Sequence, residues 1–282
     1  MTAAAPSNAD LGRGFWAGAN DSWGDRIVFS VGLAIALTVV LVFPFADMQL
    51  PALPKVGGLH AALLLAADLV VLRALAGSPL TTATALLAAG FSFTAVMALS
   101  WILLFPGAVA GTGSILRADP GSFGWLFAAW KLLASLLVAL AVFAWPGRAL
   151  RGSMGPACAA GVALALAMHV LVTHGGLLPP YFVDPQMLRF SPWPLRCTYA
   201  AATVSALALL YAWLADLMHK RLVWLPLLLA ADAAGLVLST FSGGRFTLGW
   251  YASRALSGLA AAGIIFVVLV LLRRGRAGRG TH

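Results

Sequence analysis

Four charged residues lie inside long apolar segments of the sequence, and they are the residues best placed to do chemistry. Lys131 and Arg254 are cations, whereas Asp68 and Asp232 are carboxylates. In a segment that spans a bilayer, a charge near the centre costs about 2.5 to 3.5 kcal/mol on translocon-based scales. Each of these charges therefore needs a partner, a ligand or a wet cavity.

Two interpretations fit these charges. In the first, an outward-facing polar cavity uses Lys131, Arg254 and Arg245 to hold an anionic or carbonyl-bearing ligand. In the second, Lys131 pairs with Asp68 or Asp232 and locks helices together, because charges within spans face the bundle interior. The candidate ligand-binding residues are Lys131, Trp250, Tyr251, Arg254, Arg245 and His174, and the candidate intramembrane charge partners are Asp68 and Asp232.

Histidines on facing helices can hold haem or a metal, so the histidines form a separate question. His60 and His174 are predicted at matching depth, near the outer ends of their spans. No second matched pair lies on the inner side, as electron transfer across the membrane would need. We therefore expect no cofactor, with haem bound through His60 and His174 as the alternative. Cys158 and Cys197 have neither a disulfide framework nor a metal-ligand spacing.

Enzymatic motifs are missing from the sequence. It has no P-loop, no nucleophile elbow and no pair of carboxylates at catalytic spacing. We therefore predict no catalytic residue and no enzymatic activity.

Composition places these residues in a membrane protein. Of the 282 residues 61% are hydrophobic and only 10% are charged, and the mean hydropathy is +0.94. These values lie outside the range of soluble globular domains. The net charge of +9 comes from cations scattered singly between apolar segments, a pattern that indicates no nucleic-acid surface.

The lengths of the apolar segments predict the fold. A hydrocarbon core about 30 Å thick needs about 20 residues of helix. We therefore expect an all-α, polytopic integral membrane bundle of about eight transmembrane helices. The predicted spans are residues 27–46, 57–75, 82–105, 123–145, 156–174, 197–218, 222–240 and 248–272.

The distribution of Lys and Arg predicts the orientation. Most of the 18 basic residues fall in segments on the same side as the N-terminus, and cytoplasmic loops carry this excess. Both termini are therefore predicted to be cytoplasmic. The predicted organisation is an N-terminal cytoplasmic segment over residues 1–26, a single transmembrane sensor-like bundle over 27–272, and a short basic cytoplasmic tail over 273–282.

Several short motifs together resemble one known family. The fairly specific one is Arg245-Phe246-Thr247-Leu248-Gly249-Trp250-Tyr251 followed by Arg254. The weaker ones are Asp68-Leu69-Val70, Phe105-Pro106-Gly107, Trp125 with Trp130, and Leu178-Pro179. The pattern resembles the membrane-associated sensor domains of the MASE type, fourth class. It departs from that pattern at Trp130-Lys131, where we would expect Trp-His.

The resemblance implies a sensory module of the bacterial inner membrane, usually placed before a diguanylate cyclase or histidine kinase domain. No such domain follows residue 272. We therefore expect either a stand-alone protein that signals through a separate protein or a homo-oligomer, or a fragment of a longer product. The expected partners are the lipid bilayer and an unknown small ligand, with no nucleic acid. The alternative function is a small-solute or ion transporter or channel with a polar intramembrane pathway.

Overall fold

The computed structural model describes residues 22–109, 113–116, 119, 121–145, 147–174, 178–184, 186, 188–215 and 224–277. Within them, each predicted apolar segment corresponds to one α-helix, so the all-α bundle is confirmed. A short 3-10 helix, η1, follows the first. The elements are α2 Ser22–Val42, η1 Phe43–Phe45, α3 Pro54–Leu75, α4 Thr82–Leu104, α5 Ser122–Phe143, α6 Gly155–His174, α7 Pro192–Leu214, α8 Trp224–Phe241 and α9 Leu248–Ala277.

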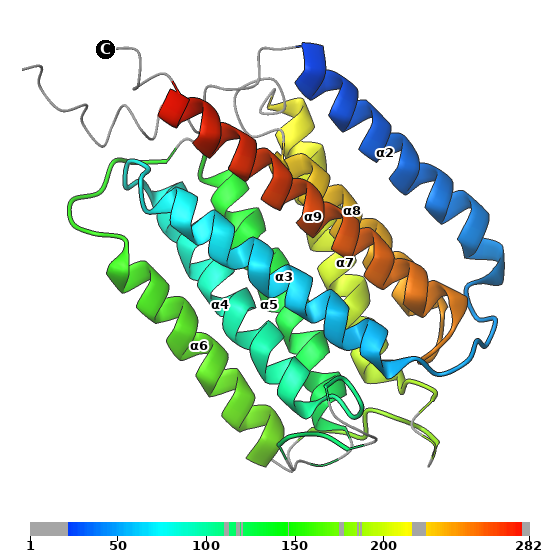
Figure 1. Cartoon of the computed structure of the whole chain (residues 1–282). Helices are drawn as coiled ribbons and strands as arrows, with labels where there is room; N and C mark the ends of the chain where they lie inside the picture. Colours follow the sequence, from blue (N-terminus) through cyan, green and yellow to red (C-terminus); the bar gives the residue numbers. More distant parts are fainter. Residues whose placement is uncertain are drawn as a thin grey trace, which may run out of the picture.

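The helices run alternately up and down the bundle (Figure 1). α4 packs against α3, α5 and α6, while α9 packs against α3 and α8. α7 contacts both α5 and α8, and α2 lies outside against α8. The start of α2 and the end of α9 lie at the same end of the bundle (Figure 1). The cytoplasmic location of that end stays a prediction.

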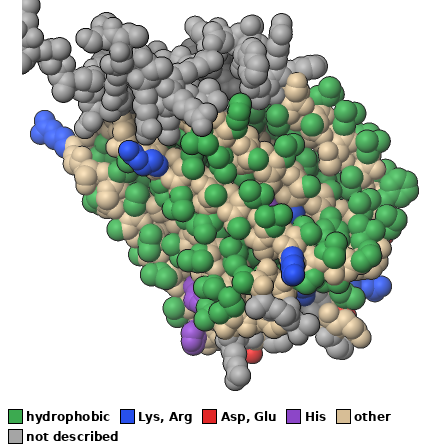
Figure 2. All heavy atoms as spheres, viewed as in Figure 1, with side chains coloured by type: hydrophobic (Ala, Val, Ile, Leu, Met, Phe, Trp, Pro, Cys, Tyr) green, Lys and Arg blue, Asp and Glu red, His purple; other side chains and the backbone are tan. Residues whose placement is uncertain are grey.

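The exterior of the bundle suits a bilayer. Among the described residues, the five helices α3 to α7 are long and apolar enough to cross a membrane. α2 and α8 contribute shorter apolar stretches, over Ser30–Phe45 and Leu227–Phe241. Figure 2 shows hydrophobic side chains spread across the described part of the visible face, with few charged groups among them. The chain is thus a multi-pass integral membrane protein, although eight complete spans remain a prediction.

Local sequence signals explain where several helices begin and end. Thr81 caps α4, because its hydroxyl accepts a hydrogen bond from the Thr84 N–H at 3.2 Å. Pro106 cannot continue α4, and Gly107 follows with a φ of 77° that suits glycine. α7 begins at Pro192, earlier than the predicted Cys197, because proline is well accommodated in the first turn of a helix. The predicted turn at His219-Lys220-Arg221 lies outside the described residues.

Three connections meet at the end of the bundle opposite the described chain ends. They are residues 46–50 between α2 and α3, residues 181–184, 186 and 188–190 between α6 and α7, and residues 242–247 between α8 and α9. Backbone hydrogen bonds join the third connection to the other two. These are Leu50 N–H to Phe246 O at 2.8 Å, Arg245 N–H to Leu188 O at 2.7 Å and Phe190 N–H to Gly243 O at 3.0 Å. This joined layer covers the start of α9.

Candidate functional site

A small cavity lies beneath this layer, and we call it the arginine cavity. It has a volume of about 20 Å³. Its walls come from the end of α4, the starts of α5, α7 and α9, the end of α8 and the two longer connections. They are mostly aromatic and include two guanidinium groups. The lining residues are Trp101, Phe105, Phe123, Gly124, Phe127, Tyr181, Phe182, Phe190, Pro194, Leu195, Thr198, Ser239, Arg245, Trp250 and Arg254.

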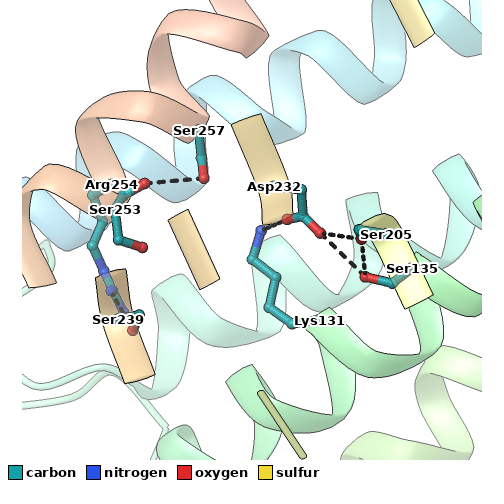
Figure 3. A network of polar contacts seen from close by, with 8 residues as sticks. All are labelled: Lys131, Ser135, Ser205, Asp232, Ser239, Ser253, Arg254 and Ser257. Carbon is teal, nitrogen blue, oxygen red and sulfur yellow. Dashed lines mark hydrogen bonds and ion pairs between the residues drawn. The ribbon is translucent and has the colours of Figure 1, made fainter. Parts of the chain in front are cut away.

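Arg254 reaches the cavity from the second turn of α9 and is only 5% exposed. Its guanidinium lies 4.2 Å from the ring centroid of Trp250 and 4.8 Å from that of Phe127. Nη1 donates a long hydrogen bond to the Ser239 hydroxyl at 3.4 Å (Figure 3). It donates a second long hydrogen bond to the Trp250 carbonyl at 3.3 Å. Nε is buried and has no hydrogen-bond partner. The guanidinium is therefore poorly satisfied by the protein.

Arg245 reaches the same cavity from the connection before α9 and is 7% exposed. Its guanidinium lies within 5 Å of three ring centroids, those of Phe246, Phe105 and Phe123. Its Nε is buried without a partner. Burial lowers the pKa of Arg245 to about 10, although the nearby Tyr181 and Asp184 oppose this shift. The side chain is still charged at neutral pH.

The backbone between the two arginines is strained. Phe246 has a φ of 58°, which is uncommon for a residue other than glycine and costs about 1 to 3 kcal/mol. The Phe246 carbonyl accepts the Leu50 N–H at 2.8 Å, so the neighbouring connection holds this conformation. The Thr247 hydroxyl then caps α9 by accepting the Trp250 N–H at 3.2 Å. The strained residue is thus fixed between Arg245 and the helix that carries Arg254.

Tyr181 closes the cavity from the connection between α6 and α7, and it was not among the predicted site residues. It is 5% exposed, and its ring packs edge-on against Trp125. The ring also lies directly against Gly124, where any side chain would collide with it. Burial raises the pKa of Tyr181 despite the nearby Arg254 and Arg245, so its hydroxyl stays neutral. The aromatic content of this connection was the available signal.

A second polar centre lies in the middle of the bundle, and we call it the ion-pair network. Lys131 of α5 donates to a carboxylate oxygen of Asp232 on α8 at 2.8 Å. The other carboxylate oxygen accepts hydrogen bonds from Ser135 and Ser205, each at 3.1 Å (Figure 3). Three helices, α5, α7 and α8, are joined through one carboxylate.

Asp68 faces the same region from α3 without forming an ion pair. It lines a cavity of about 70 Å³ together with Lys131 and Asp232. It is 4% exposed, and its Oδ2 is buried without a hydrogen-bond partner. Of the two carboxylates predicted as partners for Lys131, the structure therefore pairs Lys131 with Asp232.

The structure places the predicted ligand-binding residues in four different locations. Arg245, Trp250 and Arg254 share the arginine cavity, whereas Lys131 lies in the ion-pair network. The Tyr251 hydroxyl is used by the connection before α3, because it donates to Pro51 O at 2.6 Å and accepts from Leu53 N–H at 2.9 Å. His174 is exposed at the end of α6.

The two histidines of the alternative haem site lie in different surroundings. His60 is buried on α3, whereas His174 is exposed on α6, where its Nδ1 lies 2.8 Å from the Thr173 hydroxyl. α4 packs against both α3 and α6 and lies between them (Figure 1). The two imidazoles therefore do not form a facing pair. Nowhere among the described residues do three or more His, Cys, Asp or Glu side chains group as metal ligands.

Comparison with known families identifies a match to a family of membrane domains. A family model described as MASE4, membrane-associated sensor, integral membrane domain, matches residues 80–273. The match covers α4 to α8 and nearly all of α9, and with them both cavity-lining arginines and the whole ion-pair network. Searches of curated proteins and of solved structures found no match.

Proposed function

The chain belongs to the MASE4 family of membrane-associated sensor domains, and on this premise we propose that it senses a small ligand in the arginine cavity. One observation carries the proposal. Arg245 and Arg254 are both more than nine-tenths buried in one cavity, and neither forms an ion pair with a described carboxylate. A buried, unpaired charge in a membrane protein is costly and marks a functional site by default.

The proposed route of the signal is α9. Trp250 and Arg254 lie in its first two turns, and the helix continues for 30 residues to Ala277. At about 1.5 Å per residue, such a helix reaches across a bilayer. A ligand that favours one packing of α9 against α3 and α8 shifts the equilibrium by its differential affinity for the two packings.

We propose that the ligand enters from the envelope side and that the signal leaves on the cytoplasmic side. This assignment follows from the basic residues, which favour cytoplasmic termini, and from the cavity lying at the opposite end of the bundle from the described chain ends. A separate signalling protein or a second copy of the chain would receive the signal. The proposed location is the bacterial inner membrane.

A screen with matched variants tests the site. Purified full-length protein in detergent is heated with a panel of small metabolites, using wild type, Arg254→Ala and Arg196→Ala. Arg196 is a suitable control because it also lies over an aromatic ring, Trp193, at 4.7 Å, but is exposed. A sensed compound should raise the Tm of wild type and Arg196→Ala only. A compound that stabilises Arg254→Ala equally contradicts the proposed site.

Hydrogen exchange tests the route of the signal. The same compound should change amide exchange in α9 beyond the cavity, in its second half. Protection confined to residues around the cavity would show binding without transmission, and would contradict the sensory role of α9.

A transporter or channel is the second candidate function, and one observation favours it. Asp68, Lys131 and Asp232 line a cavity of about 70 Å³ in the middle of the bundle, large enough for several waters. Flux of protons or small solutes into proteoliposomes, lost in Asp232→Asn, would support this function. Absence of flux across a broad solute panel contradicts it.

A further inference from the structure

We infer that the arginine cavity binds a small planar oxyanion, the size of a carboxylate group, between Arg245 and Arg254. The inference rests on the proposed function and names the class of ligand for the same site. It follows from three properties of the cavity: its unbalanced charge, its unsatisfied donors and its size.

The charge of the cavity is unbalanced. Both guanidinium groups line it, and they are close enough for the charge of Arg245 to oppose that of Arg254. Among the described residues, the carboxylate that acts electrostatically on Arg245 is Asp184. That carboxylate already accepts the backbone N–H groups of Leu188, at 2.9 Å, and Arg189. An anion inside the cavity would offset two buried charges, each of which is costly to remove from water.

The donors of the cavity point to an oxyanion. The Nε atoms of Arg245 and Arg254 are buried without partners, and the Arg254 bonds to protein are long. A guanidinium presents a planar fork of N–H groups that matches the two oxygens of a carboxylate. The Arg245 guanidinium lies 4.8 Å from the Phe105 ring centroid and that of Arg254 lies 4.2 Å from the Trp250 ring centroid, and an aromatic ring accepts no strong hydrogen bond that would satisfy the free N–H groups.

The size of the cavity limits the anion. Its volume of about 20 Å³ exceeds the roughly 10 to 15 Å³ that one water needs. A carboxylate or a group of similar size fits, whereas a bulky polyhydroxy acid does not. The ion-pair network offers no equivalent site, because Asp232 neutralises Lys131 there.

The test uses purified full-length protein in detergent with sodium formate, acetate, nitrate or chloride. Sodium gluconate, a large carboxylate, keeps the ionic strength constant. Tm and tryptophan fluorescence are followed, since Trp101 and Trp250 line the cavity. We expect formate, acetate or nitrate to raise the Tm and change the fluorescence, with saturation. A response to formate and acetate alone assigns an organic carboxylate, and a response that includes nitrate assigns oxyanions in general.

Variants tie the response to the two arginines. Arg254→Gln and Arg245→Gln should each raise the anion concentration needed for half-saturation by about tenfold or more, because each removes one charge-assisted contact. Arg196→Gln should leave this concentration unchanged. Arg254→Lys retains the charge but loses the planar fork of N–H groups, so it should no longer prefer planar anions over chloride. This variant tests the inference independently of whether the glutamine variants fold.

Two results overturn the inference: a wild type that responds to none of the oxyanions or to chloride alone, or a response unchanged in both Arg254→Gln and Arg254→Lys. Two other results distinguish the failure of this inference from the failure of the proposed function. An uncharged compound that alters exchange in α9 through Arg254 would leave the sensor intact and refute the anion. An anion that binds without changing exchange in α9 would support this inference and refute sensing through α9.

Discussion

Lys131 and Arg254 are both buried cations on helices of one bundle, and they differ in what surrounds them. Lys131 donates to one carboxylate oxygen of Asp232 at 2.8 Å, and two serines donate to the other oxygen. Arg254 has aromatic faces, two long hydrogen bonds and an unpartnered Nε. The two side chains thus carry the same charge, but the protein satisfies the hydrogen-bonding groups of Lys131 and leaves those of Arg254 poorly satisfied.

The difference separates a structural contact from a site. The ion-pair network joins α5, α7 and α8, and removing Lys131 or Asp232 leaves the opposite charge without its partner. In the arginine cavity, by contrast, buried donors lack partners in the native protein, and the neighbouring connection holds the strained Phe246 through a backbone hydrogen bond. Strain and unsatisfied donors persist in folded proteins mainly where function uses them.

Asp232→Asn should cause the largest loss of stability. The substitution leaves Lys131 charged and buried without its counter-ion, and removing one partner of a buried pair typically costs about 3 to 5 kcal/mol. Reversible unfolding in mixed micelles of increasing SDS fraction measures the loss.

The double variant Lys131→Met with Asp232→Leu is its control. It removes both charges and should recover most of the lost stability, since apolar replacement of a buried pair is often neutral. A double variant as unstable as Asp232→Asn would mean that Asp232 matters through its serine contacts rather than through Lys131.

Gly124→Ala should cause an intermediate loss of stability, this time at the arginine cavity. The added methyl group would collide with the Tyr181 ring, and overpacking of this kind costs about 1 to 3 kcal/mol. Displacing Tyr181 should also open the arginine cavity, which quenching of tryptophan fluorescence by acrylamide would detect. Gly263→Ala is the control, because nothing lies within 4 Å of its added atom.

Most of the fold was predictable because the bilayer dictates helix length. Each apolar segment of about 20 residues became a helix, and Pro106 with Gly107 ended α4 as expected. The start of α7 was placed too late because Cys197 follows the charged Arg196, whereas Pro192 opens the helix. Charge at an interface is a weaker boundary signal than proline.

The site was predictable only in part. Arg245, Trp250 and Arg254 stood out because they share one motif, and they do lie in one cavity. The position of Lys131 in the other centre depends on which face of α5 meets α8, and depth along a helix carries no such information. Tyr181 comes from a connection, where no periodicity indicates which side chains turn inward.

Arg254→Gln should cost less than removal of Lys131. It loses the contacts of the guanidinium with Trp250 and Phe127, worth about 0.5 to 2 kcal/mol, and it strands no carboxylate. Lys131→Gln, by contrast, leaves the half-buried Asp232 carboxylate without its cation. Parallel unfolding measurements in buffer with gluconate as the only anion compare the two. A loss for Arg254→Gln that matches the loss for Lys131→Gln would mean that Arg254 has a structural partner.

Acidic pH should slightly destabilise the connection between α6 and α7, which covers the cavity. Desolvation raises the pKa of Asp184, but hydrogen bonds from Leu188 and Arg189 outweigh it and hold the pKa below its usual range. The ionised Asp184 carboxylate therefore stabilises the fold fully above its ordinary pKa of about 3.9. This stabilisation is lost as the pH falls through the lower pKa that Asp184 has in the folded protein. Exchange of the Leu188 and Arg189 amides, corrected for intrinsic rates, should show this loss in wild type and no such step in Asp184→Asn.

A double-mutant cycle between Asp184 and Arg245 should give the smallest energy and decides whether the arginine cavity lacks a counter-ion. The Asp184 carboxylate already accepts backbone N–H groups and does not line the cavity, so its coupling to Arg245 should stay below about 0.5 kcal/mol, as for independent sites. The variants are Asp184→Asn, Arg245→Gln and their combination, compared by unfolding near pH 7. The cycle between Lys131 and Asp232 provides the contrast and should exceed this value severalfold. Equal couplings would mean that both cations have protein counter-ions, and an anion would then have no unbalanced charge to offset.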